Sequence, residues 1–431
     1  MNGNGRRVAI VDGCRTPFAK SGSDFKDLTS TELGKMAVRE LIARAELDVN
    51  EIDHVVFGTV VQSVKEPNIA REVTLGSGIP ATVPAFTVGR ACASANQAIT
   101  SGAEQIALGM ADVVIAGGAE SLTDIPILFS PEMRNALVRA SKARSMGERL
   151  KAFATIRPKN LIPVTPAIAE PTTGLTMGES AEKMAQENGI SREDQDRWAL
   201  RSHQLAAAAT ADGRLTREIA PAYIPPRYDK VVTSDNGIRA DSTYEKLSTL
   251  KPVFDRKYGT VTAGNASPLT DGGSAVLLMS EEKAKALGYK PLGYIRGYAY
   301  ASLAPSDQLL QGPVFAMPVA LKRAGITMKD VNLMEVHEAF AAQVLSNFQW
   351  FTSDKIARER LGMDKAVGLP DVDRINVMGG SIAIGHPFGA TGGRITVTLL
   401  NELKRRGGQF GLISVCAAGA MGFVMVVEAA G

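Results

Sequence analysis

The sequence predicts an α/β fold made of two similar halves, with a mainly helical insert between their segments. Short apolar runs typical of strands alternate with helix-like segments in the N-terminal part of the chain. A related alternation returns near the C-terminus, whereas the strand pattern fades from about Asp124 to Arg256. In each half a reactive residue stands on a strand-to-helix turn, so we expect the halves to face each other with these residues at their junction.

The N-terminal half is predicted from four strand-like and two helix-like segments. They are strand 8–11, helix 30–44, strand 55–57, strand 83–88, helix 93–109 and strand 112–116. Thr29 or Ser30 can cap the first helix. The second helix carries no charge before Glu104, which predicts that it is buried.

The C-terminal half repeats this order around a glycine-dense turn. The predicted segments are strand 374–378, the turn at His386, helix 390–405 and strand 410–415. An extra helical segment is expected at 350–373.

The region between the halves is rich in proline and predicts helices at 178–211, before the apolar, glycine-rich pattern resumes at 259–279. We therefore assign 1–124 and 258–290 to the N-terminal half. Residues 125–257 form an inserted loop or lid domain, and 291–431 form the C-terminal half.

The composition is that of an ordinary globular protein. The chain has 431 residues, of which 45% are hydrophobic and 22% charged, with a formal net charge of +3. No apolar run is long enough to span a bilayer, and few aromatic residues interleave with the charges, so we expect neither a membrane span nor a nucleic-acid partner. Three cysteines build no disulfide framework, which favours a reducing, cytoplasmic location, and no Cys or His spacing predicts a metal site.

Cys92 is the most informative residue of the sequence. It follows a strand-like run and precedes the predicted buried helix, so its thiol should lie at the helix N-terminus. Backbone N–H groups and the helix dipole favour a thiolate there, and the thiolate is the nucleophilic form. The other interpretation is a small buried hydrophobic residue, since free cysteines are commonly buried.

Two of the four histidines stand in unusual surroundings. His386 lies in the glycine-dense turn, and His337 follows an apolar strand-like run. Cys416 ends a predicted strand, so two thiols and two imidazoles stand at strand ends, where α/β proteins keep their sites. The remaining histidines, His54 and His203, are expected to be structural or surface residues.

Together these segments resemble the thiolases, which cleave or form 3-ketoacyl-CoA. The likeness runs over nearly the whole chain. It rests on Arg15-Thr-Pro-Phe18, the Cys92 segment, Gly117–Ser121, Thr262–Ser267 with Asp271-Gly272, His337-Glu-Ala-Phe340, Gly385-His-Pro387 and Cys416. The His-Glu-Ala-Phe form at His337, where many family members carry asparagine, is similar to the fatty-acid-degrading subgroup. That subgroup includes thiolase subunits that join a hydratase/dehydrogenase partner.

The resemblance implies a five-layered αβαβα sandwich and an acetyl-CoA C-acyltransferase, a homodimer or tetramer with CoA as a substrate and no cofactor. Cys92 would attack the 3-keto carbon with His386 as its base, and Cys416 would handle the α-proton. The backbone N–H groups of Cys92 and Ala418 would form one oxyanion hole, and Ala418 stands where the family carries glycine. His386 and His337 would meet the enolate oxygen, His337 through a water.

The resemblance also implies contacts for CoA and the acyl chain. Met177 is similar to a family residue that lines the acyl or pantetheine pocket, and Arg239 is similar to the arginine that meets the CoA adenine and phosphate. Ser267, Phe340 and Phe254 complete the expected binding set. A core methionine and a surface arginine are the other interpretations of Met177 and Arg239.

A basic run occupies the first part of the insert. Its eight basic residues, against Glu148 alone, are Arg134, Arg139, Lys142, Arg144, Arg149, Lys151, Arg157 and Lys159. The run can attract CoA phosphates, dock on a partner subunit or contact an anionic membrane surface. A solvated basic face is the alternative.

Several other functions remain to be compared with thiolysis. A decarboxylating ketoacyl synthase would lack Cys416, a cysteine hydrolase needs no second thiol, and the chain lacks the glycine spacing of nucleotide-binding motifs. A biosynthetic acetoacetyl-CoA thiolase would run the same chemistry as a Claisen condensation. A non-catalytic acyl-CoA-binding protein on this fold would tolerate loss of Cys92, His386 or Cys416, and all three are present.

Overall fold

Ten strands form one mixed sheet that consists of two half-sheets joined side by side. In the computed structural model, which describes residues 6–163 and 169–431, one half-sheet runs in the order β1-β8-β5-β3-β4 and the other in the order β9-β12-β11-β10. Antiparallel pairing of β1 with β9 joins them, and β2 pairs with β8. The strands are β1 (Val8–Arg15), β2 (Ala19–Lys20), β3 (His54–Gly58), β4 (Ala85–Val88), β5 (Val113–Glu120), β8 (Thr270–Ser280), β9 (Gly293–Ser302), β10 (Val331–Val336), β11 (Phe410–Ala417) and β12 (Met421–Ala429), with a separate hairpin of β6 (Ala222–Tyr223) and β7 (Val231–Val232).

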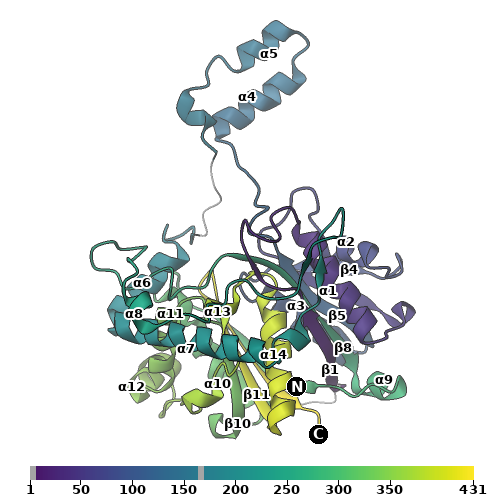
Figure 1. Cartoon of the computed structure of the whole chain (residues 1–431), viewed down its shortest axis with the longest axis vertical. Coiled ribbons are helices and arrows are strands. Elements are labelled where there is room, and N and C mark those ends of the chain that lie inside the picture. Colours follow the sequence, from purple (N-terminus) through teal and green to yellow (C-terminus); the bar gives the residue numbers. More distant parts are fainter. Residues whose placement is uncertain (1–5, 164–168) are drawn as a thin grey trace. The chain divides into compact units, whose positions relative to one another are not determined.

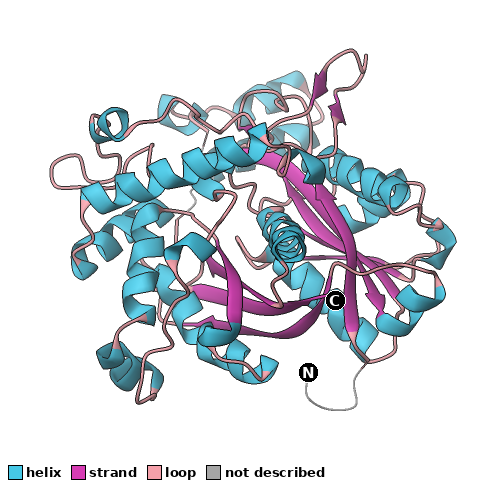
Figure 2. Ribbon diagram, turned by 60° about the horizontal axis from the view of Figure 1, so that its bottom comes forward, coloured by secondary structure: helices cyan, strands magenta, loops and turns pink. Residues whose placement is uncertain are grey.

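The helices complete five layers around the half-sheets (Figure 2). Helices α1 (Ser30–Arg44) and α2 (Ile69–Gly76) cover the outer face of the first half-sheet. Helices α10 (Gly312–Ala324) and α11 (Ala341–Phe351) cover the outer face of the second. Helices α3 (Ser94–Ala107) and α14 (Thr391–Arg406) pack against each other between the half-sheets. The predicted sandwich of two α/β halves is confirmed.

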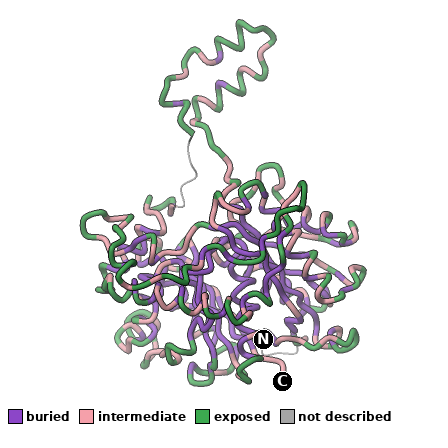
Figure 3. The backbone as a smooth tube through the Cα atoms, viewed as in Figure 1, coloured by how far each residue is buried: buried purple, intermediate pink, exposed green. Residues whose placement is uncertain are grey.

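The backbone is most deeply buried along the sheet and the two central helices (Figure 3). α3 is buried at nine of its positions, because its sequence is built from small and apolar residues with one charge near its end. α1 begins where Thr29 and Glu32 form a capping box, as the sequence predicts. The two central helices start at the same end of the fold, and this is where the reactive residues lie.

One predicted strand is wrong. A 3₁₀ turn, Val372–Arg374, ends at the first residue of this segment, 374–378. Asn376 then adopts a left-handed backbone with a φ of 46°. The Asn376 side chain takes the place of a strand neighbour, since it accepts from the Val336 N–H at 2.7 Å and donates to the Val336 carbonyl at 2.9 Å. Asparagine tolerates a left-handed backbone, so the run 374–378 turns at Asn376 and does not form the predicted strand.

The chain forms two compact units, Ile125–Ala169 and the rest of the chain. The predicted insert is therefore divided between them. The smaller unit contains α4 (Pro131–Lys142), α5 (Met146–Ala152) and a 3₁₀ turn at Pro158–Leu161 (Figure 1). Residues 164–168 of the insert, like residues 1–5 of the first half, lie outside the described residues. The expected helices at 178–211 are α6 (Met177–Asn188) and α7 (Arg192–Ala211), which pack within the larger unit.

The remaining helices are short. They are α8 (Tyr244–Ser248), α9 (Glu281–Ala286), α12 (Asp354–Ile356) and α13 (Ser381–Ile384). The extra helical segment predicted at 350–373 is helical only to Leu361, where a π-helical turn ends at Gly362 with a φ of 65°.

Candidate active site

The turn that carries Cys92 joins β4 to α3 in a conformation that few residues adopt. Ala91 has a φ of 44°, in the left-handed region that is uncommon for residues other than glycine. The Ser94 hydroxyl closes the turn, since it accepts from the Arg90 N–H at 2.8 Å and donates to the Ala91 carbonyl at 2.7 Å. Cys92 is half-buried and stands directly before the Ala93 N-cap of α3, as the sequence predicts.

The turn that carries His386 lies between α13 and α14 and is fully buried. Gly385 has a φ of 112°, and a Cβ there would stand 2.6 Å from the Thr270 Cγ2. Only glycine fits both constraints. Nδ1 of His386 lies 2.7 Å from the Thr391 hydroxyl in the first turn of α14, which fixes the ring from behind.

Glu120 links the His386 turn to the loop that follows β3. Its buried carboxylate, at the end of β5, accepts from the N–H groups of Val60 at 3.0 Å, Val61 at 2.9 Å and Gly389 at 2.9 Å. Burial raises the pKa of Glu120 to about 7, although these N–H groups act in the opposite direction. The carboxyl group therefore anchors the His386 turn to the N-terminal half.

His337 follows β10 and has no exposed surface. Its backbone N–H donates to the Ser414 carbonyl at 2.8 Å, and its Nδ1 lies 3.0 Å from the Ser381 hydroxyl. Behind it, the buried Glu338 accepts from Trp198, Ser202 and Asn376. The ring is thus held by Ser381, and the backbone around it is held through Ser414 and the partners of Glu338.

Cys92, His337 and His386 converge, as expected for residues at the junction of the two halves. The sulfur of Cys92 and one ring nitrogen of each histidine all lie within 4.8 Å of one another. The histidine ring centroids are 4.0 Å apart. Nε2 of each ring is buried and has no hydrogen-bond partner among the residues that the structure describes, so both nitrogens are available to a bound molecule.

Burial sets the charge of this cluster. It raises the pKa of the Cys92 thiol to about 11, although the N–H groups of Ala418 and of Cys92 itself act to lower it. Burial lowers the pKa of His337 to about 3, with Arg394 adding to the effect. Burial, His337 and Arg394 hold the pKa of His386 well below its usual value. The cluster therefore contains a neutral thiol and two neutral imidazoles at pH 7.

The expectation that the position of Cys92 favours a thiolate is wrong for the resting protein. Desolvation outweighs the N–H groups at the start of α3. Proton transfer from Cys92 to a neighbouring imidazole must accompany bond formation, because neither charged partner is stable before substrate arrives.

Cys416 is the penultimate residue of β11 and is 1% exposed. Burial raises the pKa of its thiol well above the usual value, and the proximity of Cys92 raises it further. The Ala418 N–H acts to lower the pKa of the Cys92 thiol by hydrogen bonding to its sulfur. This is the effect expected of a second oxyanion-hole donor. The two thiols therefore interact with each other, and the Cys92 sulfur also meets the predicted backbone donors.

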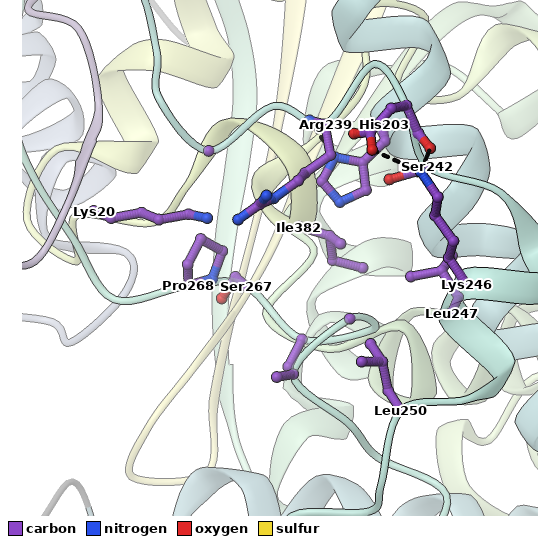
Figure 4. Close-up of a pocket in the computed structure, with 15 residues that line it drawn as sticks. Lys20, His203, Arg239, Ser242, Lys246, Leu247, Leu250, Ser267, Pro268 and Ile382 are labelled. Carbon is purple, nitrogen blue, oxygen red and sulfur yellow. Dashed lines mark hydrogen bonds and ion pairs between the residues drawn. The ribbon is translucent and has the colours of Figure 1, made fainter.

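The structure contains a cavity of about 600 Å³, and Figure 4 draws the residues that line it. Arg239 and Ser267 line it, as expected for CoA contacts. The Ser267 N–H donates to the Ala339 carbonyl at 2.9 Å, and Ile382, which follows Ser381, forms part of the wall. The cavity therefore reaches segments adjoining His337.

Two cations face each other across this cavity. The charged ends of Lys20 and Arg239 point toward one another (Figure 4), and neither has a hydrogen-bond partner among the described residues. Burial and then the Arg239 charge lower the pKa of Lys20. The carboxylate of Asp241 is already paired with Lys246 at 2.7 Å. The cavity thus presents two positive charges without an anion, an arrangement that favours phosphate.

His203, which the sequence predicts to be a structural or surface residue, is buried and also lines the cavity. Its Nδ1 accepts from the Arg239 N–H at 3.2 Å. Burial, Lys20 and Arg239 lower its pKa to about 4, so it is neutral at pH 7. His54, the other histidine set aside, is half-buried at the start of β3, where its ring packs on Phe86.

Three residues of the predicted binding set share one apolar cluster. Met177, Phe254 and Phe340 pack against an apolar cluster that includes Cys416, and the two phenylalanine ring centroids lie 6.2 Å apart. Gly178 allows this packing, because a Cβ there would overlap the Phe254 ring at 1.9 Å. The three side chains therefore belong to the same apolar cluster as the second thiol.

The unit Ile125–Ala169 carries the basic run on α4, on α5 and in the segments that follow each of them. Several large apolar side chains of this unit are exposed, among them Met146 at 68% and Leu150 at 69%. Arg139, Lys142 and Lys151 line a surface hollow of about 560 Å³. Basic and apolar groups are thus presented together, as on surfaces that contact membranes or partner proteins.

Sequence reasoning missed the residues that orient the two histidines. Ser381, Thr391, Glu120 and Glu338 lie within or beside the matched motifs, but their types alone do not reveal a buried contact. Lys20 was missed because it stands far from Arg239 in the sequence. Among the described residues, no helix combines the length and apolarity required to cross a bilayer.

Comparison with known proteins gives consistent results along the whole chain. Residues 8–282 match the thiolase N-terminal domain, and residues 289–429 match the thiolase C-terminal domain. The chain is 52% identical to the 3-ketoacyl-CoA thiolase of Pseudoalteromonas translucida over 99% of this chain and 98% of that protein. It is 51% identical to the 3-ketoacyl-CoA thiolase of Yersinia pestis over 98% of this chain and 97% of that protein.

Solved structures agree with these sequence matches. The Bacillus anthracis acetyl-CoA acetyltransferase superimposes with a TM-score of 0.84 at 35% identity, covering 99% of this chain and 100% of that one. The human mitochondrial 3-ketoacyl-CoA thiolase in complex with CoA superimposes with a TM-score of 0.83 at 34% identity, covering 99% and 98%.

Proposed function

Because this chain belongs to the thiolase family, we propose that it cleaves 3-ketoacyl-CoA with CoA to give acetyl-CoA and a shortened acyl-CoA. The observation that carries the proposal is the convergence of Cys92, His337 and His386 within 4.8 Å, next to the second thiol of Cys416. A second buried thiol has no role in simple hydrolysis. The His-Glu-Ala-Phe form at His337 and the names of the bacterial relatives support the degradative direction, in fatty acid β-oxidation.

The first half-reaction forms an acyl-enzyme. His386 takes the Cys92 proton as the sulfur bonds to the 3-keto carbon, and the C2–C3 bond breaks. Its electron pair passes to the enolate of acetyl-CoA, whose oxygen His386 and His337 stabilise by hydrogen bonding. Cys416 then protonates C2, and its raised pKa suits a group that must hold a proton until the carbanion forms.

The second half-reaction returns the enzyme to its resting state. The CoA thiol passes its proton to the Cys416 thiolate and attacks the acyl-Cys92 carbonyl. The backbone N–H groups of Cys92 and Ala418 stabilise the oxyanion. Cys92 leaves as a thiolate and recovers its proton from His386. The same groups run in reverse give Claisen condensation.

We assign CoA to the cavity that Arg239 and Ser267 line. Lys20 and Arg239 hold a phosphate of CoA, Ser267 meets the pantetheine, and Met177, Phe254 and Phe340 meet the acyl chain. Lys20→Ala should raise the KM for CoA several-fold while kcat stays within about twofold, because one charge-assisted contact is lost far from the reacting atoms. An unchanged KM would remove Lys20 from the phosphate site.

The proposed reaction uses no cofactor. Although Cys92, His337 and His386 are a donor set that one metal ion could use, each has a role in the acyl-transfer scheme. Turnover should therefore be unaffected by preincubation with a strong chelator. Loss of activity that added zinc restores would contradict this scheme.

A thiolysis assay with purified protein and 3-ketoacyl-CoA substrates of different chain length tests the proposed function. Disappearance of substrate should depend on free CoA and follow ping-pong kinetics. Cys416→Ser provides the sharper arm. This variant should still acquire an acyl group at Cys92, but it should lose exchange of the acetyl-CoA methyl protons with deuterated water. Normal exchange would remove Cys416 from the mechanism.

We further propose a cytoplasmic homo-oligomer that dimerises through β4. This strand forms one end of the sheet, and its exposed edge includes Phe86, which is 37% exposed. Phe86→Lys should shift the protein to a monomer in light-scattering measurements at micromolar concentration. Leu108→Lys, at a site 75% exposed at the other end of α3, is the matched control. A dimeric Phe86 variant would exclude this edge.

We propose that the unit Ile125–Ala169 docks on a hydratase/dehydrogenase subunit or on an anionic membrane. Charge reversal at Arg139, Lys142 and Arg149 should weaken association in both co-purification and vesicle sedimentation, and short-chain turnover should persist. A matched triple reversal of exposed residues elsewhere, Lys290, Lys329 and Lys355, should leave association intact. If the KM for CoA rises while association is unchanged, the basic run serves CoA instead.

A further inference from the structure

Two hydroxyl groups stand behind the histidine pair, and they differ in their other hydrogen bonds. The Ser381 hydroxyl lies 3.0 Å from Nδ1 of His337, and the Thr391 hydroxyl lies 2.7 Å from Nδ1 of His386. A neutral imidazole carries one proton. The partner of Nδ1 therefore decides whether Nε2, the nitrogen that faces the site, donates or accepts.

The hydrogen bonds of Ser381 assign the proton of His337. Arg394 donates to the Ser381 oxygen at 3.2 Å and is itself held by Glu335 at 3.3 Å. Because a guanidinium has only donors, the hydroxyl proton of Ser381 is free to point elsewhere. Among the described residues, Nδ1 of His337 is the only acceptor within hydrogen-bonding distance of it. Nδ1 accepts, so Nε2 of His337 carries the proton.

The hydrogen bonds of Thr391 assign the opposite tautomer to His386. The Thr391 hydroxyl donates to the Pro387 carbonyl at 3.1 Å. Its single proton is used there, so Nδ1 of His386 must donate to the Thr391 oxygen. The reverse assignment would leave the hydroxyl and carbonyl oxygens 3.1 Å apart with no proton between them. Nε2 of His386 therefore carries a lone pair.

We propose that Ser381 and Thr391 are positioning residues that hold the two active-site histidines in opposite tautomers. His386 then presents an acceptor to the Cys92 thiol, and His337 presents a donor to the substrate oxygen. Two rings with centroids 4.0 Å apart are thereby prevented from exchanging roles. The catalytic meaning of this assignment rests on the proposed thiolysis, but the tautomers themselves do not.

Nitrogen NMR of protein labelled with ¹⁵N-histidine tests the tautomers directly. With signals assigned from His337→Asn and His386→Asn variants, His337 should give the Nε2–H pattern and His386 the Nδ1–H pattern at pH 7. Ser381→Ala should broaden or shift the His337 signals alone, and Thr391→Val those of His386 alone. Thr396→Val, whose hydroxyl bonds only to the Gly392 carbonyl one turn along α14, is the matched control and should affect neither. The same tautomer at both histidines would overturn the proposal.

A double-variant series tests the function of Ser381. Ser381→Ala should lower kcat on the order of tenfold with little change in KM, the scale expected for a residue that orients a functional histidine. Ser381→Thr keeps a hydroxyl and should recover most of that loss. An asparagine has no tautomer, so Ser381→Ala should have no further effect in the His337→Asn background. An equal loss in both backgrounds would mean that Ser381 acts only structurally. If the protein proves to have another activity, the NMR result still decides the tautomers.

Discussion

The turn that carries Cys92 and the turn that carries His386 meet at one site but are built differently. The Cys92 turn is half-buried and contains an alanine with left-handed backbone. The His386 turn is fully buried, contains a glycine where only glycine fits, and is fixed by Thr391 and by Glu120 from the other half. The group that must form and break a covalent bond thus has room to do so. The groups that must only move protons are held rigidly.

Burial shifts the pKa values of Cys92 and His386 in opposite directions, but it favours the neutral form of both. It does so because it penalises the charged forms, the thiolate of Cys92 and the imidazolium of His386. A cysteine and a histidine in water would share a proton more evenly near neutral pH. The site therefore rests uncharged, which protects the thiol from adventitious electrophiles and leaves activation to the bound substrate.

Replacing Cys92 should have the largest effect on turnover. Cys92→Ala removes the nucleophile and should lower kcat by about 10⁴-fold or more, because a covalent path cannot start without it. Peptide mass spectrometry after incubation with acyl-CoA should find the acyl group on Cys92 in the parent protein and nowhere in the variant. Cys14→Ala is the matched control, since Cys14 is buried in the outer core and its thiol donates to the Ala37 carbonyl. Acylation at Cys14 or Cys416 alone would reject the assignment.

Replacing His337 should have the next largest effect. His337→Ala should lose about 10²-fold in kcat, the scale of removing one oxyanion-hole donor. His337→Asn keeps a neutral donor and should retain much of the activity. The pKa of His337 is lowered to about 3, so His337 should not titrate above pH 5 in the parent protein. The pH–rate profiles of the parent protein and of His337→Asn should therefore have the same shape above pH 5. Equal impairment of the two variants would show that donation is not the role of His337.

The pH dependence of Cys92 alkylation measures the burial effect directly. A pKa raised to about 11 means that the thiolate fraction near neutral pH is small and grows about tenfold for each pH unit up to that value. The rate of iodoacetamide modification of the resting enzyme should follow this slope from pH 7 to 10, with Cys92→Ala as the blank. A rate that levels off near pH 7 would mean that an ion pair with His386 exists before substrate binds.

Much of the fold could be predicted because apolar periodicity determines which residues are buried. The strands at 8–11, 55–57 and 410–415 and the helices at 30–44 and 93–109 all formed where expected. The prediction of a strand at 374–378 was wrong because a side chain can replace a neighbouring strand. The Asn376 side chain supplies both a donor and an acceptor to the end of β10. Hydrophobicity along a sequence cannot distinguish the two cases.

The site could be predicted in part for a related reason. Cys92, His337, His386 and Cys416 are rare residue types in distinctive glycine-rich or strand-end contexts, so the sequence indicates them. Ser381 and Thr391 are common residue types, and only their distance to an imidazole nitrogen gives them a role. The charge state was misjudged, because a sequence shows that a thiol precedes a helix but does not show how completely the fold excludes water from it.

Substitutions that alter only the backbone freedom of each turn should give the smallest effects. They compare the rigidity of the two turns without changing a reactive side chain. Ala91→Gly relieves a left-handed alanine, a gain of about 1 kcal/mol that is offset by about 0.4–1 kcal/mol of added freedom in the unfolded chain. We expect the free energy of unfolding in urea to change by less than about 1 kcal/mol and kcat to stay within a few-fold. Gly385→Ala places a Cβ 2.6 Å from Thr270 at a φ of 112°, so it should cost more stability and also displace His386. Equal effects at the two positions would contradict the contrast between an adaptable Cys92 turn and a rigid His386 turn.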